Sequence, residues 1–496
     1  MEIVYSPKPL LAILVSLGAA ALILFSGKRP NLREAWTILA AGAKFLIALS
    51  MAPSILNGKV LEYTMVTLSP GISLQLRVDA FGLFFGILAS GLWIATSIYS
   101  IGYMRDLQEH AQTRYFFCFA VAISATIGVA FSANLLTLFL FYEILTIATY
   151  PLVAHKETPE ALAAGRKYLA YLLTAAAVIL FSITYTYHLA GSLDFVGGGF
   201  LAGRGSPAVL RLLFVTFILG FGTKAAFMPM HEWLPTAMIA PTPVSALLHA
   251  VAVVKAGVFC CLRVIDFVFG PSLLFDLNLW LILCYFVSCT IIGASLLALA
   301  QDNLKRRLAF STISQLSYIV LGAALITPSA LRGSILHIAF HGFMKITLFF
   351  CAGAIFVKTG KENISAMNGI GRQMPLTLGA FAVGAIGLAG IPPICGYLSK
   401  WYLGLGSLEA KEIAFVVILM TSSLLNVAYF FPIIYNAFFK KAEGEGAPSR
   451  AEASWWMVGP ILICALMSII LGLNPDAFIG FYKIASAVVE GIQGLD

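Results

Sequence analysis

Residues 333–357 read GSILHIAFHGFMKITLFFCAGAIFV. An apolar run of this length can cross a hydrocarbon core of about 30 Å as a helix. His337, His341 and Lys345 recur every four positions within it, so at about 3.6 residues per turn they share one slowly drifting stripe. The stretch predicts a membrane-spanning helix whose polar stripe faces a wet protein interior, because charged side chains are costly in lipid.

The rest of the chain has the same apolar character. Its 496 residues are 60% hydrophobic and 11% charged, whereas soluble domains carry about 25% charged residues. This composition excludes a soluble globular enzyme. We expect an all-α polytopic membrane protein with about fourteen transmembrane helices. The predicted spans are residues 9–26, 35–52, 79–103, 114–130, 133–154, 164–188, 208–228, 243–265, 276–300, 307–325, 333–357, 375–404, 411–438 and 455–474.

Lysine and arginine outside these spans concentrate in the loops that follow odd-numbered helices. By the positive-inside rule those loops are cytoplasmic, so both termini are predicted to lie on the outer side of the membrane. The longest polar stretch, residues 440–452, is predicted to be an exposed cytoplasmic loop. Topology accounts for the net charge of +8, which therefore does not indicate nucleic-acid binding.

A few ionisable residues lie deep inside the predicted spans. At mid-membrane each costs about 2.5 to 3.5 kcal/mol on insertion scales, so each requires a partner or a function. They are Glu143, Lys44, Lys224, Lys255, Lys345, Lys400, His249, His337 and His341.

The predicted roles of these residues differ. A carboxylate near a desolvated lysine favours its charged form, so Glu143 and Lys224 could take up a proton when close and release it when apart. In one continuous helix, His249 and Lys255 would point about 120° apart. His249 alone could equally bond a neighbouring helix. Lys44 stands by itself, and we expect it to contact another subunit or reach the membrane surface without a transport role.

Two predicted helices are broken by proline. Pro229 and Pro235 interrupt the end of the seventh, and Pro392 and Pro393 interrupt the twelfth. Freed backbone groups are tolerated only where protein or water satisfies them. Interrupted helices at matching positions predict two inverted five-helix repeats. The predicted division is residues 1–110 for helices 1–3, 111–268 and 269–440 for the repeats, and 441–496 for the loop and last helix.

Three segments carry a family resemblance. They are PTPVSALLH at 241–249 continuing to Lys255, KRRLAFSTISQ at 305–315, and the helix from His337 to Lys345 with LFFCAG after it. The chain resembles the antiporter-like membrane subunits of respiratory complex I, Mrp cation/proton antiporters and membrane-bound hydrogenases. The match runs from Asp79 to the fourteenth helix. The sequences of the predicted eighth and eleventh helices are most similar to the D-type subunits of Mrp antiporters and to the corresponding subunit of membrane-bound hydrogenases.

The resemblance implies a proton path through the middle of the membrane as part of Na⁺/H⁺ exchange, in an Mrp antiporter or an Mrp-containing respiratory complex. By this resemblance, Glu143 and Lys224 would take up the proton at the start of the path. Lys255 or His249 would connect the two halves of the path, and Lys400 would be its last group. His337, His341 and Lys345 are the implied central relay. The implied partners are the other membrane subunits of a multisubunit complex, including a peripheral redox module in a respiratory setting.

Other function classes remain as alternatives. A structural membrane subunit without conduction would tolerate neutral residues at positions 143 and 224. A stand-alone secondary solute transporter would need a pocket for substrate at the midplane. The sequence contains no nucleotide-binding loop, haem-attachment motif or cysteine cluster, so we expect no metal or cofactor in this chain and no catalysis by the chain itself.

Overall fold

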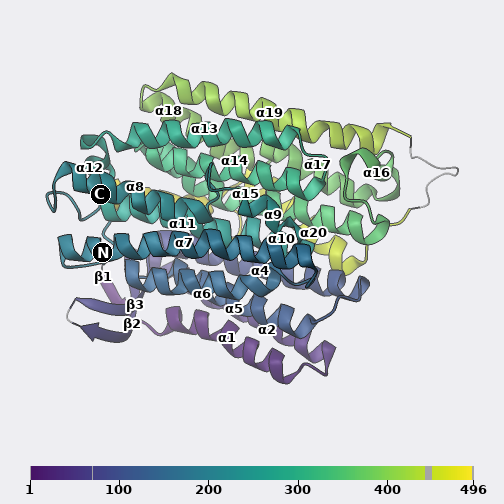
Figure 1. The fold of residues 1–496 in the computed structure, drawn as a ribbon, viewed down its shortest axis with the longest axis horizontal. Helices are drawn as coiled ribbons and strands as arrows, with labels where there is room; N and C mark the ends of the chain where they lie inside the picture. The colour runs from purple at the N-terminus through teal and green to yellow at the C-terminus, as the bar shows by residue number, and fades with distance from the viewer. Residues whose placement is uncertain (1, 70, 442–449, 494–496) are drawn as a thin grey trace.

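The computed structural model describes residues 2–69, 71–441 and 450–493. Long helices run side by side through the molecule (Figure 1). Within the described residues, eleven helices are long and apolar enough to cross a membrane. They are α1 (Lys8–Phe25), α2 (Pro30–Leu49, continued by α3, Ala52–Leu56), α4 (Ala80–Asp106), α5 (Gln112–Ala130), α6 (Leu135–Val153), α7 (Pro159–Ala190), α8 (Pro207–Lys224), α13 (Leu279–Leu299), α15 (Pro328–Thr359), α19 (Ile413–Phe439) and α20 (Trp455–Leu473).

The three remaining predicted spans are also helical. Residues 307–325 fall in α14 (Leu304–Ala324). The span at 243–265 consists of α10 (Thr242–Ala250) and α11 (Val253–Leu262), and that at 375–404 consists of α17 (Pro375–Ala389) and α18 (Gly396–Glu409). The helical polytopic class is confirmed. The count of about fourteen crossings and the division into inverted repeats stay predictions.

Local sequence fixes where many helices begin. Asp79, Asn134 and Asn303 precede α4, α6 and α14, and each accepts a hydrogen bond from a backbone N–H in the first turn. These contacts satisfy N–H groups that have no partner inside the helix. Polar caps therefore fix where these three helices begin.

The two proline-containing segments interrupt helices at both predicted places. After α8 ends at Lys224, residues 225–241 contain only α9 (Trp233–Thr236) and the 3₁₀ turn η1 (Ala237–Ile239). Pro392 and Pro393 lie in the gap between α17 and α18. Proline lacks the N–H that would continue the helix, which accounts for both gaps.

The prediction of one continuous helix over 243–265 was wrong. It breaks at Val251 and Ala252, whose backbone angles (φ −131°, ψ −55° and φ −94°, ψ −84°) are not helical. No glycine or proline marks this break, and valines disfavour helix only slightly. The segment then continues as a π-helical stretch, η2 (Arg263–Phe269), before α12 (Pro271–Asp276). The predicted 120° separation of His249 and Lys255 assumed an unbroken helix and does not hold.

A small sheet and a final helix were not predicted. Strand β1 (Glu2–Tyr5) pairs parallel with β2 (Lys59–Ser69), which pairs antiparallel with β3 (Ile72–Val78). Helix α21 (Phe481–Gln493) packs one apolar face against α4 and α15. Residues of β1 and α21 line one cavity, so both end segments lie at the same end of the bundle. The smaller elements are η3 (Ile364–Ala366) and α16 (Ile370–Gln373).

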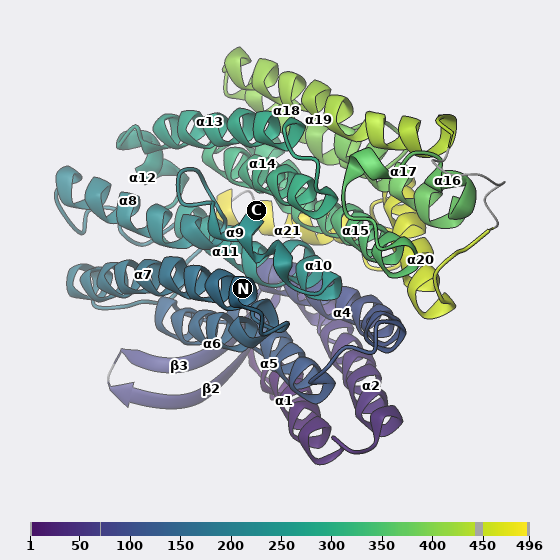
Figure 2. The same ribbon diagram turned by 45° about the vertical axis from the view of Figure 1, so that its right-hand side comes forward.

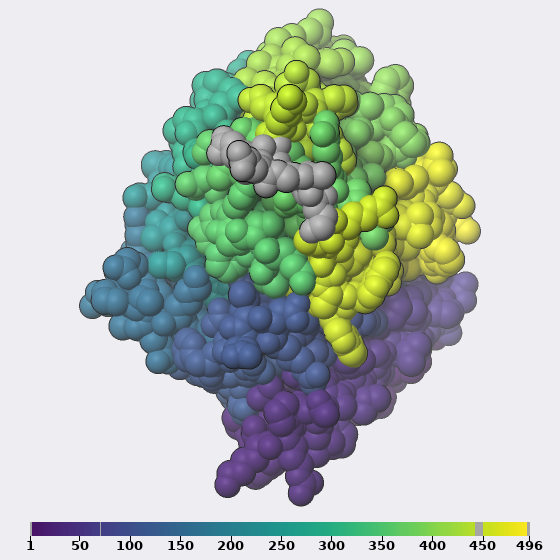
Figure 3. Space-filling view, turned by 90° about the vertical axis from the view of Figure 1, so that its right-hand side faces the viewer, coloured from purple at the N-terminus to yellow at the C-terminus, as the bar shows by residue number. Residues whose placement is uncertain are grey.

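The chain crosses the bundle from one flank to the other. Helices α1 and α2 form one flank, and α18 and α19 form the opposite one (Figure 2). The view onto one end of the bundle shows the same order, from purple N-terminal residues to the green and yellow segments (Figure 3). Helix α15 lies between the flanks and packs against α4, α10, α14, α17, α18, α20 and α21. Its polar stripe is therefore enclosed by protein. The predicted loop at 440–452 falls largely on residues 442–449, outside the described residues.

Candidate functional site

Lys224 is the last residue of α8 and is fully buried. Its Nζ donates to the Tyr142 carbonyl oxygen at 2.8 Å and to Thr146 Oγ1 at 2.8 Å, both on α6. The ammonium also lies 3.2 Å from the centroid of the Tyr142 ring. A cation at a helix C-terminus interacts favourably with the helix dipole. Two oxygen atoms and an aromatic ring, rather than a carboxylate, therefore stabilise the charge of Lys224.

Glu143 lies next to this lysine but does not pair with it in this structure. No ion pair joins them among the described residues, and Glu143 Oε1 is buried without a described hydrogen-bond partner. Tyr142 and Thr146 share the α6 face that meets Lys224, whereas Glu143 is turned about 100° from Tyr142. The predicted pair is therefore a pair of neighbours on adjacent faces, without direct contact.

His249 and Lys255 flank the break between α10 and α11, and both are fully buried. Their side-chain nitrogens have no hydrogen-bond partner within the part of the chain that the structure describes. The His249 ring stacks on Phe349 of α15 with centroids 4.6 Å apart. Buried polar groups without protein partners require water or another ligand. This broken segment is therefore a polar spot between apolar helices.

The predicted stripe on α15 is buried along its whole length. His337 is bracketed by Ser399 Oγ, 2.8 Å from its Nδ1, and Gln315 Oε1, 3.0 Å from its Nε2. The His341 ring lies 5.7 Å from that of His337, and neither of its nitrogens has a partner among described residues. Lys345 donates to the Leu308 carbonyl oxygen of α14 at 3.1 Å. Both ends of the stripe are thus held by hydrogen bonds, whereas the buried His341 in the middle has none among the described residues.

Lys400 lies at the second proline break. Its Nζ donates to the Leu388 carbonyl oxygen at 2.6 Å and to Ser423 Oγ at 3.0 Å. In a continuous helix this carbonyl would accept from residue 392, but Pro392 has no N–H to give. Lys400 replaces the lost donor, and it also lines a cavity of about 440 Å³ bounded by α18 and α19. The break therefore creates the polar contact that holds this lysine.

The buried side chains stand on a connected series of helices. Helix α8 meets α6 through Lys224, and it packs on α11, α11 on α10, α10 on α15, and α15 on α18. Lys224, Lys255, the α15 stripe and Lys400 thus lie on successive neighbours across the bundle. We refer below to one set of residues as the buried basic row, in which Lys400 is partly buried and the others are fully buried: Lys224, His249, Lys255, His337, His341, Lys345 and Lys400.

A second set of polar residues joins this row and was not predicted. Gln315 Nε2 donates to Asn426 Oδ1 at 3.3 Å, Tyr429 OH also donates to Asn426 Oδ1, and Ser311 Oγ lies 2.9 Å from the same tyrosine oxygen. Ser422 also belongs to this set, and its Oγ lies 3.1 Å from Ser295 Oγ of α13. Helical spacing of Ser311 with Gln315, and of Ser422 with Asn426 and Tyr429, was a usable signal.

Contrary to the prediction from the sequence, Lys44 does not lie at the membrane surface or against another subunit. Its side chain is fully buried inside this chain, with Nζ 2.5 Å from Ser16 Oγ and 5.1 Å from the centroid of the Trp93 ring. It therefore neither reaches the membrane surface nor lies against another subunit. Its position among α1, α2 and α4 separates it from the buried basic row.

Comparison with known proteins places the chain in a family. The family model described as "NADH:quinone oxidoreductase/Mrp antiporter, TM" matches residues 132–426. The NADH-quinone oxidoreductase subunit N of Desulforudis audaxviator is 33% identical over 462 residues, covering 90% of each chain. A Na(+)/H(+) antiporter subunit of Alkalihalophilus pseudofirmus is 29% identical, covering 85% of this chain and 55% of that protein.

The fold is also found in a solved complex. A chain of the Mrp complex from Dietzia sp. DQ12-45-1b superposes with a TM-score of 0.88 and 21% sequence identity, covering 98% of this chain and 97% of that one. These relatives do not single out the D-type Mrp subunits, so that finer assignment stays a prediction. The chain is a multi-pass membrane protein that belongs to the NADH:quinone oxidoreductase/Mrp antiporter transmembrane family, whose members here are subunits of oxidoreductase or antiporter complexes.

Proposed function

We propose that this chain is a proton-translocating, antiporter-like subunit of a multisubunit membrane complex. The supporting observation is the buried basic row, whose members stand on successive packed helices. Ionisable groups are expensive in a membrane and mark ion paths. The similarity to a Na(+)/H(+) antiporter subunit and to a chain of an Mrp complex supports cation (Na⁺)/H⁺ exchange at the level of the complex, in an Mrp antiporter or in an Mrp-containing respiratory complex.

In this proposal protons pass along the row in steps between neighbouring helices. A proton enters at Lys224 and passes through water to Lys255 or His249. It then moves along His337, His341 and Lys345 and leaves by way of Lys400. The nitrogens of Lys255, His249 and His341 that have no described protein partner are the positions where bound water connects the steps.

Glu143 provides the control point. On α6 it lies beside Leu140 and Ile147, which are 40% and 64% exposed on this chain. A carboxylate on a lipid-facing surface is costly, so a neighbouring subunit covers this face in the assembled complex. Charge movement in that subunit draws Glu143 toward Lys224 or away from it, and the charged form of Lys224 is favoured accordingly.

The remaining assignments follow from the same proposal. The chain is not catalytic by itself and holds no cofactor, so redox chemistry belongs to partner subunits. It resides in a prokaryotic cell membrane with both termini outside. The strand β1 and the helix α21 share one end of the bundle, which agrees with an even number of crossings.

The proposal is tested by replacing Lys224 with alanine in the complete complex. Cation-coupled proton movement is measured in inverted membrane vesicles after equal assembly has been verified. Lys44→Ala is the matched control, because Lys44 is an equally buried lysine outside the row. We expect Lys224→Ala to abolish transport and Lys44→Ala to preserve it.

Other outcomes identify the alternatives. Unchanged transport in Lys224→Ala would favour a structural subunit whose partners conduct the ions. Solute uptake by the isolated chain, without partner subunits, would favour a stand-alone transporter.

A further inference from the structure

Two loops outside the buried basic row bring three metal-ligating side chains together. Glu109 and His110 lie in the loop between α4 and α5, and His155 lies in the loop between α6 and α7. Their ligand atoms all lie within 4.8 Å of one another. The sequence did not predict this cluster, because His155 is remote from the other two along the chain.

The distances suit one small metal ion. Glu109 Oε2 lies 3.8 Å from His110 Nδ1 and 3.9 Å from His155 Nε2. The two imidazole rings are 4.8 Å apart and tilted by 31°. Tetrahedral ligands at zinc bond lengths of about 2.0 to 2.2 Å lie about 3.4 Å from one another. The two distances from Glu109 Oε2 therefore exceed this spacing by only about half an ångström, and small side-chain rotations would bring all three ligand atoms onto one ion.

His155 is the strongest sign of a ligand. Its side chain is fully buried, and neither ring nitrogen has a hydrogen-bond partner within the described part of the chain. Leaving a buried polar group unsatisfied costs about 1 to 3 kcal/mol. His110, by contrast, is 47% exposed and Glu109 is 15% exposed, so an ion can reach the cluster from the solvent side.

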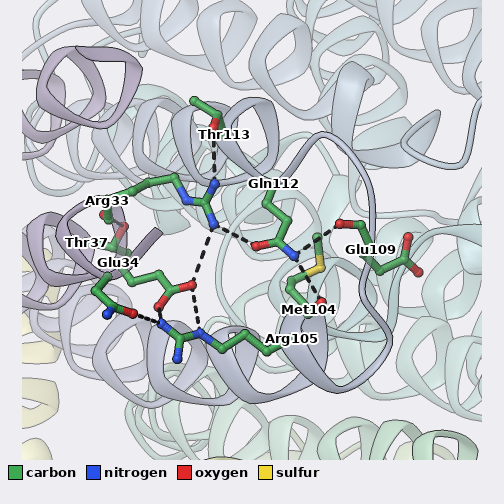
Figure 4. A network of polar contacts seen from close by, with 9 residues as sticks. Arg33, Glu34, Thr37, Met104, Arg105, Glu109, Gln112 and Thr113 are labelled. Carbon is green, nitrogen blue, oxygen red and sulfur yellow. Dashed lines mark hydrogen bonds and ion pairs between the residues drawn. The ribbon is translucent and has the colours of Figure 1, made fainter. Parts of the chain in front are cut away.

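The Glu109 carboxylate is available for this role. Figure 4 shows it directed away from the polar network of Arg33, Glu34 and Arg105, and Gln112 donates to the backbone oxygen of Glu109 at 3.1 Å. The network therefore holds the loop through its backbone and leaves the carboxylate free.

The neighbouring arginines are neutralised by other carboxylates. Arg105 pairs with Glu34, and Arg114 pairs with Glu157. Arg114 also donates to the His155 carbonyl oxygen at 3.1 Å, which orders the second loop. These two arginines thus have their own partners and oppose a bound cation less strongly.

We propose that Glu109, His110 and His155 bind one Zn²⁺ ion, which ties the loop at 107–111 to the loop at 154–158. Two imidazoles and one carboxylate form a ligand set that zinc accepts, with the fourth position left for water. Calcium and magnesium prefer sites made entirely of oxygen ligands. This site lies outside the proposed proton path and does not depend on it.

The test uses the complete complex, stripped with a chelator and reloaded with Zn²⁺ alone. Zinc per complex is measured by elemental analysis, and affinity is measured by competition with a chromophoric chelator. We compare the parent with His110→Gln, which alters an exposed side chain and spares the packing. His188→Gln, at an exposed histidine near the end of α7, is the matched control.

The parent is expected to bind one more equivalent of zinc than His110→Gln, whose affinity for zinc at this site should be weaker by about tenfold or more. His188→Gln should match the parent. Zinc should also slow proteolytic cleavage at 154–158 in the parent and in His188→Gln, but not in His110→Gln. Equal zinc binding in the parent and His110→Gln, or no zinc bound to the parent, would overturn the proposal.

Discussion

Replacing Thr146 with valine should weaken the binding of the Lys224 charge while keeping the lysine. The substitution is nearly isosteric and removes the hydroxyl that accepts from Lys224 Nζ at 2.8 Å. Lys224 retains the Tyr142 carbonyl oxygen, also at 2.8 Å, and the Tyr142 ring. The variant therefore alters the energy of the protonated lysine without emptying the site.

The magnitude follows from the lost contact. A hydrogen bond to a charged group contributes about 1.5 to 3 kcal/mol, and about 1.4 kcal/mol corresponds to a factor of ten. The protonated form of Lys224 should lose stability by a factor of about 10 to 150. A higher proton concentration is then needed to protonate the lysine. The pH profile of transport should therefore shift to more acidic values, and the rate at neutral pH should fall about tenfold.

The assay is cation-coupled proton movement in inverted vesicles, recorded across a range of pH. Thr149→Val is the matched control. Thr149 is one turn further along α6 and equally buried, but its hydroxyl contacts Tyr168 and the Leu145 carbonyl oxygen instead of Lys224. If Thr146→Val leaves the pH profile unchanged, or if both variants shift it equally, the assigned role of the Lys224 contact is wrong.

Two further variants test other contacts. Gln315→Leu removes the oxygen that faces His337 Nε2 and should lower both transport and the free energy of unfolding, the latter by about 1 to 3 kcal/mol, because a buried imidazole nitrogen loses its partner. Ser399→Ala removes the partner of the other ring nitrogen and should lower both in the same way. Normal transport in both variants would exclude a relay at His337. Arg263→Met leaves Asp79 without its two-pronged ion pair and should lower unfolding stability by up to about 3 to 5 kcal/mol. Thermal unfolding should then show partial recovery when Asp79→Asn is added, and no recovery would count against the pair.

Sequence alone determined the membrane class and many of the buried groups. Hydrophobic runs long enough to span a bilayer have few alternatives to helix, because backbone groups in lipid must be satisfied within the segment. The same cost makes His337, His341 and Lys345 conspicuous in an apolar helix. Proline has no N–H, so the interruptions at Pro229 and Pro392 could be predicted from residue type.

Contacts between distant segments could not be predicted in this way. The helix break at Val251 has no local marker, and Lys44 is enclosed only because α1 and α4 pack around α2. Residues 2–5 and 59–69 pair as strands although α1, α2 and α3 lie between them in the chain. Whether Glu143 touches Lys224 depends on which α6 face meets α8.

The sequence by itself determined that this protein spans the membrane and carries ionisable groups at bilayer depth, because helical periodicity and the cost of charge in lipid act within each segment. Only the tertiary structure decided which of those groups are neighbours and that His155 meets Glu109 and His110. The physical reason is that the position of a side chain around and along its helix is local, whereas its partners depend on how whole helices pack.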